Sequence, residues 1–122
     1  MLTHFENTKT TPDDYDLIVT GDLGKLGSEI LIDLMEDKGF KLGVNYGDCG
    51  QMYFRRDQKT LCGGSGCGCS ATVFNSYIMK KLQDGQYGRV LFMPTGALLS
   101  TTATQQGESV PGVCHAIVIE RE

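Results

Sequence analysis

The order of apolar segments predicts a single α/β domain. A strand-like run at residues 14–20 comes before a helical pattern that begins at residue 26, and a second helical pattern comes before two strand-like runs near the end of the chain. Strands that alternate with helices are typical of α/β layers. With 122 residues and 40% hydrophobic content, the chain can build one hydrophobic core.

The first strand and helix are the clearest pair. Residues 14–20 are rich in strand-forming types and stop at Gly21, and the apolar spacing then changes to a helical period that ends at Gly39. Apolar side chains fall on two adjacent rows of this helix: Leu26, Ile30, Leu34 and Leu31, Met35. A strand followed by a helix is half of a βαβ unit.

The rest of the chain is predicted to contain two loops, one helix and two strands. Glycines interrupt residues 44–54, which predicts a loop with at most a short strand at residues 52–54. Residues 71–82 are apolar around most of a helical cylinder, so we expect burial on most sides. Residues 89–93 and 114–120 are strand-like and should be neighbours in one sheet, joined by a polar loop at 101–112.

Composition excludes several classes of protein. The formal net charge is −4 and the pI is near 5.1, so no basic field is available for nucleic acid. The apolar stretches are shorter than a membrane span, and the polar first residues do not resemble a signal peptide. We expect residues 1–13 to be a lead-in without an element and residues 14–122 to form the domain. An odd number of cysteines, five, predicts reduced thiols.

The glycine-rich and cysteine-rich loop at residues 61–71 is the strongest candidate site. Its Cys-x4-Cys-x-Cys spacing differs from zinc motifs, so we expect no metal ligands. The thiols either pack where a helix begins, or Cys67 or Cys69 faces a ligand with its pKa lowered by the helix terminus. The glycines either permit close packing or expose N–H groups to an anion, aided by Ser65 and Ser70.

Other polar residues are weaker candidates. Asp22 either faces a ligand or caps the helix that follows it. Arg55 and Arg56 lie in a polar turn where we expect solvation, and His115 begins a predicted strand. Residues 95–100 are small and hydroxyl-rich after a buried strand, which is where α/β sheets place ligands.

Three segments together resemble the stage V sporulation protein AD family of endospore-forming bacteria: residues 15–24, 64–71 and 95–100. Members are more than twice as long, so the chain resembles only their C-terminal half. The resemblance implies a protein without demonstrated catalysis or cofactor that binds dipicolinic acid, alone or as its calcium chelate. It also implies a peripheral location at the cytoplasmic face of the forespore inner membrane, beside channel proteins that load this solute into the spore.

The family's thiolase-like fold stacks two α/β halves in five layers, with one helix of each half in the central layer. The resemblance therefore predicts that residues 71–82 are that helix and that an N-terminal half, or a second copy of the chain, lies opposite. The preceding loop would face a cleft and contact ligand. The residues expected there are Asp22, Ser65, Gly66, Cys67, Gly68, Cys69 and Ser70.

Condensing enzymes of this fold place a histidine after the first strand of this half and an asparagine in the glycine loop, where both stabilise an oxyanion. Here Asp22 occupies the first region, and residues 63–66 contain no amide side chain. We therefore expect no catalytic residues. An acyltransferase half-site and a cysteine metal-binding module are the alternatives.

Overall fold

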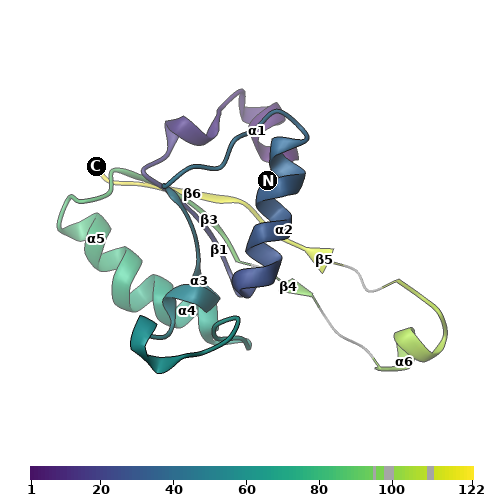
Figure 1. The fold of residues 1–122 in the computed structure, drawn as a ribbon. Helices are drawn as coiled ribbons and strands as arrows, with labels where there is room; N and C mark the ends of the chain where they lie inside the picture. Colours follow the sequence, from purple (N-terminus) through teal and green to yellow (C-terminus); the bar gives the residue numbers. More distant parts are fainter. Residues whose placement is uncertain (95, 98–100, 110–111) are drawn as a thin grey trace.

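The computed structural model describes residues 1–94, 96–97, 101–109 and 112–122. Its centre is a mixed four-stranded sheet in the order β2-β1-β3-β6, in which β1 is parallel to β2 and β3, and β6 is antiparallel to β3 (Figure 1). The strands are β1 (Leu17–Thr20), β2 (Tyr46–Asp48), β3 (Arg89–Met93) and β6 (Ile117–Glu120). The predicted α/β class is confirmed, and so is the pairing of the last two strands.

Helices cover both faces of the sheet. Helix α2 (Gly24–Glu36) and the short α1 (Leu2–Thr8) lie on one face (Figure 1). On the other face α4 (Cys69–Val73), the π-helical segment η3 (Phe74–Ile78) and α5 (Met79–Gln83) follow one another without a break, and we call them the 69–83 helix. The helix predicted at residues 71–82 is confirmed.

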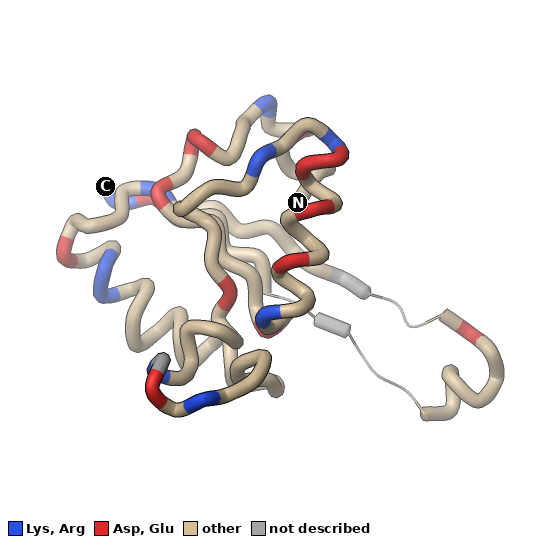
Figure 2. Tube along the Cα trace, in the orientation of Figure 1, with Lys and Arg blue, Asp and Glu red and all other residues tan. Residues whose placement is uncertain are grey.

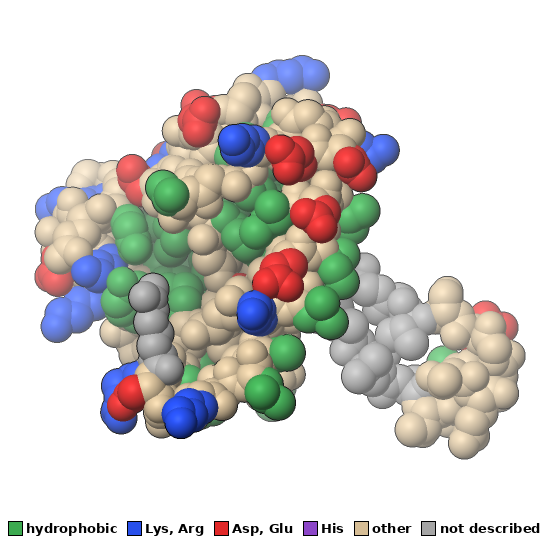
Figure 3. Space-filling view, in the orientation of Figure 1, with side chains coloured by type: hydrophobic (Ala, Val, Ile, Leu, Met, Phe, Trp, Pro, Cys, Tyr) green, Lys and Arg blue, Asp and Glu red, His purple; other side chains and the backbone are tan. Residues whose placement is uncertain are grey.

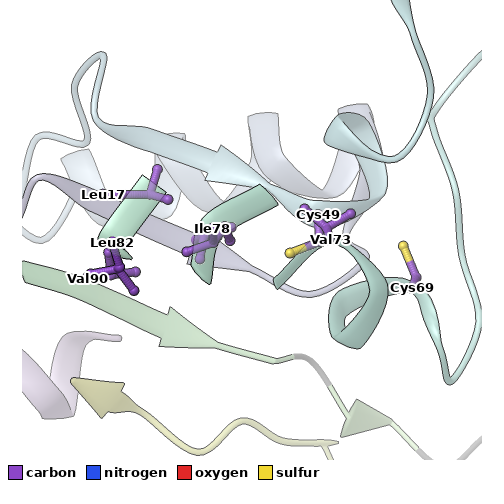
Figure 4. Close-up of a cluster of buried hydrophobic side chains, with 8 residues drawn as sticks. Leu17, Cys49, Cys69, Val73, Ile78, Leu82 and Val90 are labelled. Atoms are coloured by element: carbon purple, nitrogen blue, oxygen red, sulfur yellow. The ribbon is translucent and has the colours of Figure 1, made fainter. Parts of the chain in front are cut away.

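The core is divided by the alternation of side chains along the strands. Leu17, Val19 and Val90 point to the 69–83 helix and pack with Cys49, Cys69, Val73, Ile78 and Leu82 (Figure 4). Ile18 and Leu91 point to the opposite face, in a second buried cluster. The other members of that cluster are Phe5, Tyr15, Met35, Leu42 and Met93.

Helix α2 turns one of its two apolar rows to the surface. Met35 is buried, whereas Leu26, Ile30 and Leu34 are 62%, 51% and 57% exposed. Figure 3 shows hydrophobic side chains beside the acidic ones of this helix, and Figure 2 shows the acidic positions spaced along it. The helix itself was predicted, but only its Leu31–Met35 side contributes to the core.

The expectation that the 69–83 helix is buried on most sides is wrong for the described chain. Val73, Ile78 and Leu82 are buried against the sheet, while Ala71 is exposed and Tyr77 is 44% exposed. The sheet covers one side of this helix, and the exposed residues of the helix are mostly polar: Ala71, Thr72, Asn75, Ser76, Tyr77, Lys80 and Gln83. The π-helical turn in its middle is a feature often found at functional sites.

The predicted loop at residues 44–54 is wrong in two places. Tyr46–Asp48 forms strand β2, and residue 52, where the prediction allowed at most a short strand, belongs instead to helix α3 (Cys49–Met52). A strand of three residues around Gly47 is too short to show a period of two, and its conformation comes from pairing with β1. A Cβ at Gly47 would lie 3.4 Å from the sulfur of Met52, so this strand and α3 are closely packed.

The expectation that residues 1–13 contain no element is also wrong. Helix α1 buries Phe5, which is 1% exposed and stacks on Phe40 with 5.2 Å between ring centroids. A 3₁₀ turn, η1 (Pro12–Asp14), leads into β1. Helix α1 has no side-chain cap and no acidic first turn, so packing rather than local sequence stabilises it. The division of the chain at residue 13 stays a prediction.

The segment between β3 and β6 includes the predicted polar loop at residues 101–112, and it contains short elements that were not predicted. Short strands β4 (Gly96–Ala97) and β5 (Gly112–Val113) pair antiparallel, and helix α6 (Thr101–Gln105) lies away from the main sheet (Figure 1). The last strand begins at Ile117, so His115 precedes it and is exposed. Of the candidate segment 95–100, residues 95 and 98–100 lie outside the described residues. Within the described ranges, no helix is long and apolar enough to cross a membrane.

Candidate functional site

Asp22 binds the loop that the sequence singles out. It follows β1, and its carboxylate oxygen Oδ2 accepts hydrogen bonds from the Ser65 hydroxyl at 2.9 Å and the Gly66 N–H at 3.0 Å. The loop therefore does present donors to a negative charge, as its composition suggests. In this structure that negative charge is an internal carboxylate.

Asp48, not Asp22, caps helix α2. The carboxylate of Asp48 accepts from the N–H groups of Leu23 at 3.0 Å and Gly24 at 2.9 Å. It also accepts from the Thr20 hydroxyl at 2.7 Å and from the Gln51 N–H at 3.2 Å, which caps α3. At 1% exposure, this carboxylate joins β1, β2, α2 and α3. The capping alternative for Asp22 is thus wrong.

Sequence reasoning missed Asp48, although a signal was present. An aspartate three residues before a glutamine is typical of a helix N-terminus, and here it begins α3. The surrounding hydroxyls extend the network, because the Tyr46 hydroxyl lies 2.9 Å from that of Thr20 and 3.3 Å from that of Ser28. Burial raises the pKa of Tyr46, so its hydroxyl stays protonated at neutral pH.

The cysteines divide into two buried and three exposed thiols. Cys49 and Cys69 are buried, and Cys62, Cys67 and Cys114 are exposed. Burial raises the pKa of Cys69, and the carboxylates of Asp22 and Asp48 raise it further. For Cys69, the alternative of a thiol whose pKa is lowered is therefore wrong. Burial, with a contribution from Asp48, raises the pKa of Cys49 to about 12.

Two hollows meet beside the loop. One, of about 330 Å³, is lined by residues 64–69 together with Tyr53, Phe54 and Thr72. The other is a cleft of about 680 Å³ between β2, α3 and the 69–83 helix, and the same three residues line it. Five of the seven predicted ligand residues thus share one hollow, and Asp22 bonds to two of them. These five are Ser65, Gly66, Cys67, Gly68 and Cys69.

The remaining candidates lie elsewhere. Ser70 is half-buried in the first turn of α4 and does not line either hollow. Arg55 forms an exposed ion pair with Asp57 at 3.1 Å, and the side chain of Arg56 lies outside the description. Among the residues that the structure describes, no group of three or more His, Cys, Asp or Glu side chains could hold a metal ion.

The fold and the loop define an α/β unit that places a glycine-rich turn, bonded to an acidic residue, at the start of a helix beside a cleft. A family model described as Stage V sporulation protein AD (SpoVAD) matches residues 1–120. The chain is also 47% identical over 118 residues to Stage V sporulation protein AD of Bacillus subtilis (strain 168). The aligned region covers 97% of this chain and 35% of that protein. The chain belongs to the stage V sporulation protein AD family.

Proposed function

We propose that this chain takes part in binding dipicolinic acid and in its uptake into the developing spore, and that it does so without catalysis. Membership of a sporulation protein family supports a role in the spore. The ligand is the one that the family resemblance implies. Because the chain spans 35% of its curated relative, this role would be one part of the activity of the longer protein.

The contact of Asp22 with Ser65 and Gly66 is the observation that carries the non-catalytic part of the proposal. An oxyanion site needs donors aimed at a developing negative charge. Here a carboxylate already accepts from the loop's hydroxyl and N–H, and its charge would repel an oxyanion. Cys69 supports the same conclusion, since the thiolate is the nucleophilic form and the pKa of this thiol is raised.

The hollows beside the loop support small-molecule binding. Volumes of about 330 and 680 Å³ suit a compact ligand, and Tyr53 and Phe54 line both hollows. The two rings pack edge to face with centroids 5.1 Å apart. Tyr53 is 46% exposed and Phe54 is half-buried, and the two rings offer a planar pyridine ring an aromatic contact.

The exposed side of the 69–83 helix supports a thiolase-like arrangement of two halves. Ala71, Thr72, Asn75 and Ser76 are exposed on this helix, and Tyr77 lines the cleft beside β2 and α3. In the proposed arrangement an N-terminal half, or a second copy, covers this side. Channel proteins at the cytoplasmic face of the forespore inner membrane would then be the partners in uptake.

Calorimetric titration with dipicolinate tests the proposal. We expect saturable binding to the chain, and weaker binding of picolinate, because picolinate lacks the second carboxylate. When an acyl thioester is added to the same protein, we expect no cleavage that requires Cys69, so the release of free thiol should be the same for the unmodified chain and for Cys69→Ser. Absence of dipicolinate binding, or thioester turnover that Cys69→Ser abolishes, would contradict the proposal.

A further inference from the structure

A small hollow on this acidic chain is lined by basic side chains. Lys25, Arg55 and Lys59 contribute to its wall, its volume is about 230 Å³, and among the residues that the structure describes no Asp or Glu lines it. The chain as a whole has 15 acidic and 11 basic residues, so the charge is locally reversed. A concave site lined by one sign of charge concentrates ions of the opposite sign. We call it the basic hollow.

Main-chain contacts bring these side chains together from distant parts of the sequence. The N–H of Lys25 donates to the carbonyl of Cys62 at 2.8 Å. Gly24, with φ +67°, permits this approach, because a Cβ there would lie 2.6 Å from the same carbonyl oxygen. Two residues further on, the N–H of Gly64 donates to the carbonyl of Gly50 at 2.7 Å. The segment that carries Lys59 is thus held against both α2 and α3.

Among the described residues, the nearby acids lie outside the wall of the basic hollow. Asp57 pairs with Arg55, and both side chains are at least 70% exposed. Within the described ranges, no ion pair involves Lys25 or Lys59. Glu29 lies one turn along α2 and lines an adjacent hollow with Lys25. The buried Asp48 carboxylate is already saturated by hydrogen-bond donors.

We propose that the basic hollow binds the carboxylates of a small dicarboxylate, through the ammonium groups of Lys25 and Lys59 and the guanidinium of Arg55. The inference rests on the proposed function, because it gives the proposed anionic ligand a binding place. That place is not the loop at residues 65–66, whose hydrogen-bond donors already bind Asp22. Phe54 lines this hollow as well as the two beside the loop, and supplies a wall for an aromatic ring. Phosphate shares the required anionic chemistry.

Two exposed thiols allow the site to be located in the unmodified chain. Cys62 lines the basic hollow, and Cys67 lines the hollow beside the loop. We expect dipicolinate to slow maleimide labelling of Cys62 and to leave Cys67 unchanged, as followed by site-resolved mass spectrometry. Charged hydrogen bonds predict that Lys25→Gln with Lys59→Gln weakens dipicolinate binding about tenfold or more.

Lys38→Gln with Lys41→Gln, an equal charge change at exposed positions, is the control and should bind as the unmodified chain does. If dipicolinate binds but protects only Cys67, or if both double variants bind equally, the inference is overturned and the proposed function stands. If dipicolinate does not bind but phosphate protects Cys62, the hollow is an anion site and the proposed function fails. If neither anion protects Cys62, the inference is overturned.

Discussion

Replacing Asp48 by alanine should destabilise the fold by about 3 to 5 kcal/mol. The substitution removes an acceptor that the structure shows bonded to four donors, at 2.7, 2.9, 3.0 and 3.2 Å. The Gly24 N–H would remain buried without this acceptor, the partly buried N–H groups of Leu23 and Gln51 would also lose it, and leaving such donors unpaired is costly. Because these donors belong to both α2 and α3, the loss should affect the attachment of both helices to the sheet.

Urea unfolding followed by circular dichroism measures this effect. Asp57→Ala is the control, because that side chain is 70% exposed and its ion pair should contribute less than about 1 kcal/mol. The loss of unfolding free energy in Asp48→Asn should fall between those of the two alanine variants. An amide keeps one acceptor oxygen, but its NH₂ group is a donor and would face the donors that now bind the carboxylate. A free energy of unfolding for Asp48→Ala within 1 kcal/mol of the unmodified chain would refute the structural role of this carboxylate.

Gly63→Ala should have the second large effect, a loss of about 2 to 4 kcal/mol. Gly63 has φ +108°, and a Cβ there would collide with the carbonyl of Gly50. The collision is with main-chain atoms, so a change of rotamer cannot relieve it. The loop would have to move away from α3, which would also weaken the hydrogen bond between Gly64 and Gly50.

Two other glycines of the same loop are matched controls. Gly66 has φ +119° but open space around a Cβ, so Gly66→Ala should show only the backbone strain, about 1 to 2 kcal/mol. Gly68 has φ −94° and open space, so Gly68→Ala should change stability by less than about 1 kcal/mol. Thermal unfolding of the three variants should give this order. Equal losses in all three would show that the Gly63–Gly50 contact does not hold the loop.

Sequence patterns predicted the elements with long or strongly apolar signals. The strand before Gly21, the strand Arg89–Met93 and the 69–83 helix each carry enough apolar residues to show a period or a buried run. Strand β2 and helix α1 were missed because they have three and seven residues and are determined by contacts distant in sequence. Tyr46–Asp48 is a strand because β1 pairs with it.

The sequence singled out the candidate loop by its residue types, but it did not predict which residues the loop contacts. The glycines indicated either close packing or N–H groups open to an anion, and the structure shows Gly63 packed against Gly50 and the Gly66 N–H bonded to the Asp22 carboxylate. The loop's partner, Asp22, lies 43 residues from Ser65, a separation at which no local pattern applies. Of the two alternatives for the thiols, packing fits Cys69, which is buried and whose pKa is raised by burial and by the carboxylates of Asp22 and Asp48.

The pH dependence of Cys69 alkylation tests most directly whether this loop supports binding and not nucleophilic catalysis. Site-resolved mass spectrometry of iodoacetamide labelling between pH 6 and pH 10, about the range over which thiols titrate, would give the apparent pKa of this thiol. The structure predicts a value above the ordinary 9.0, with a lower value in Asp22→Asn because one of the carboxylates that raise it is removed. An apparent pKa below about 7, as activated cysteines have, would contradict the account.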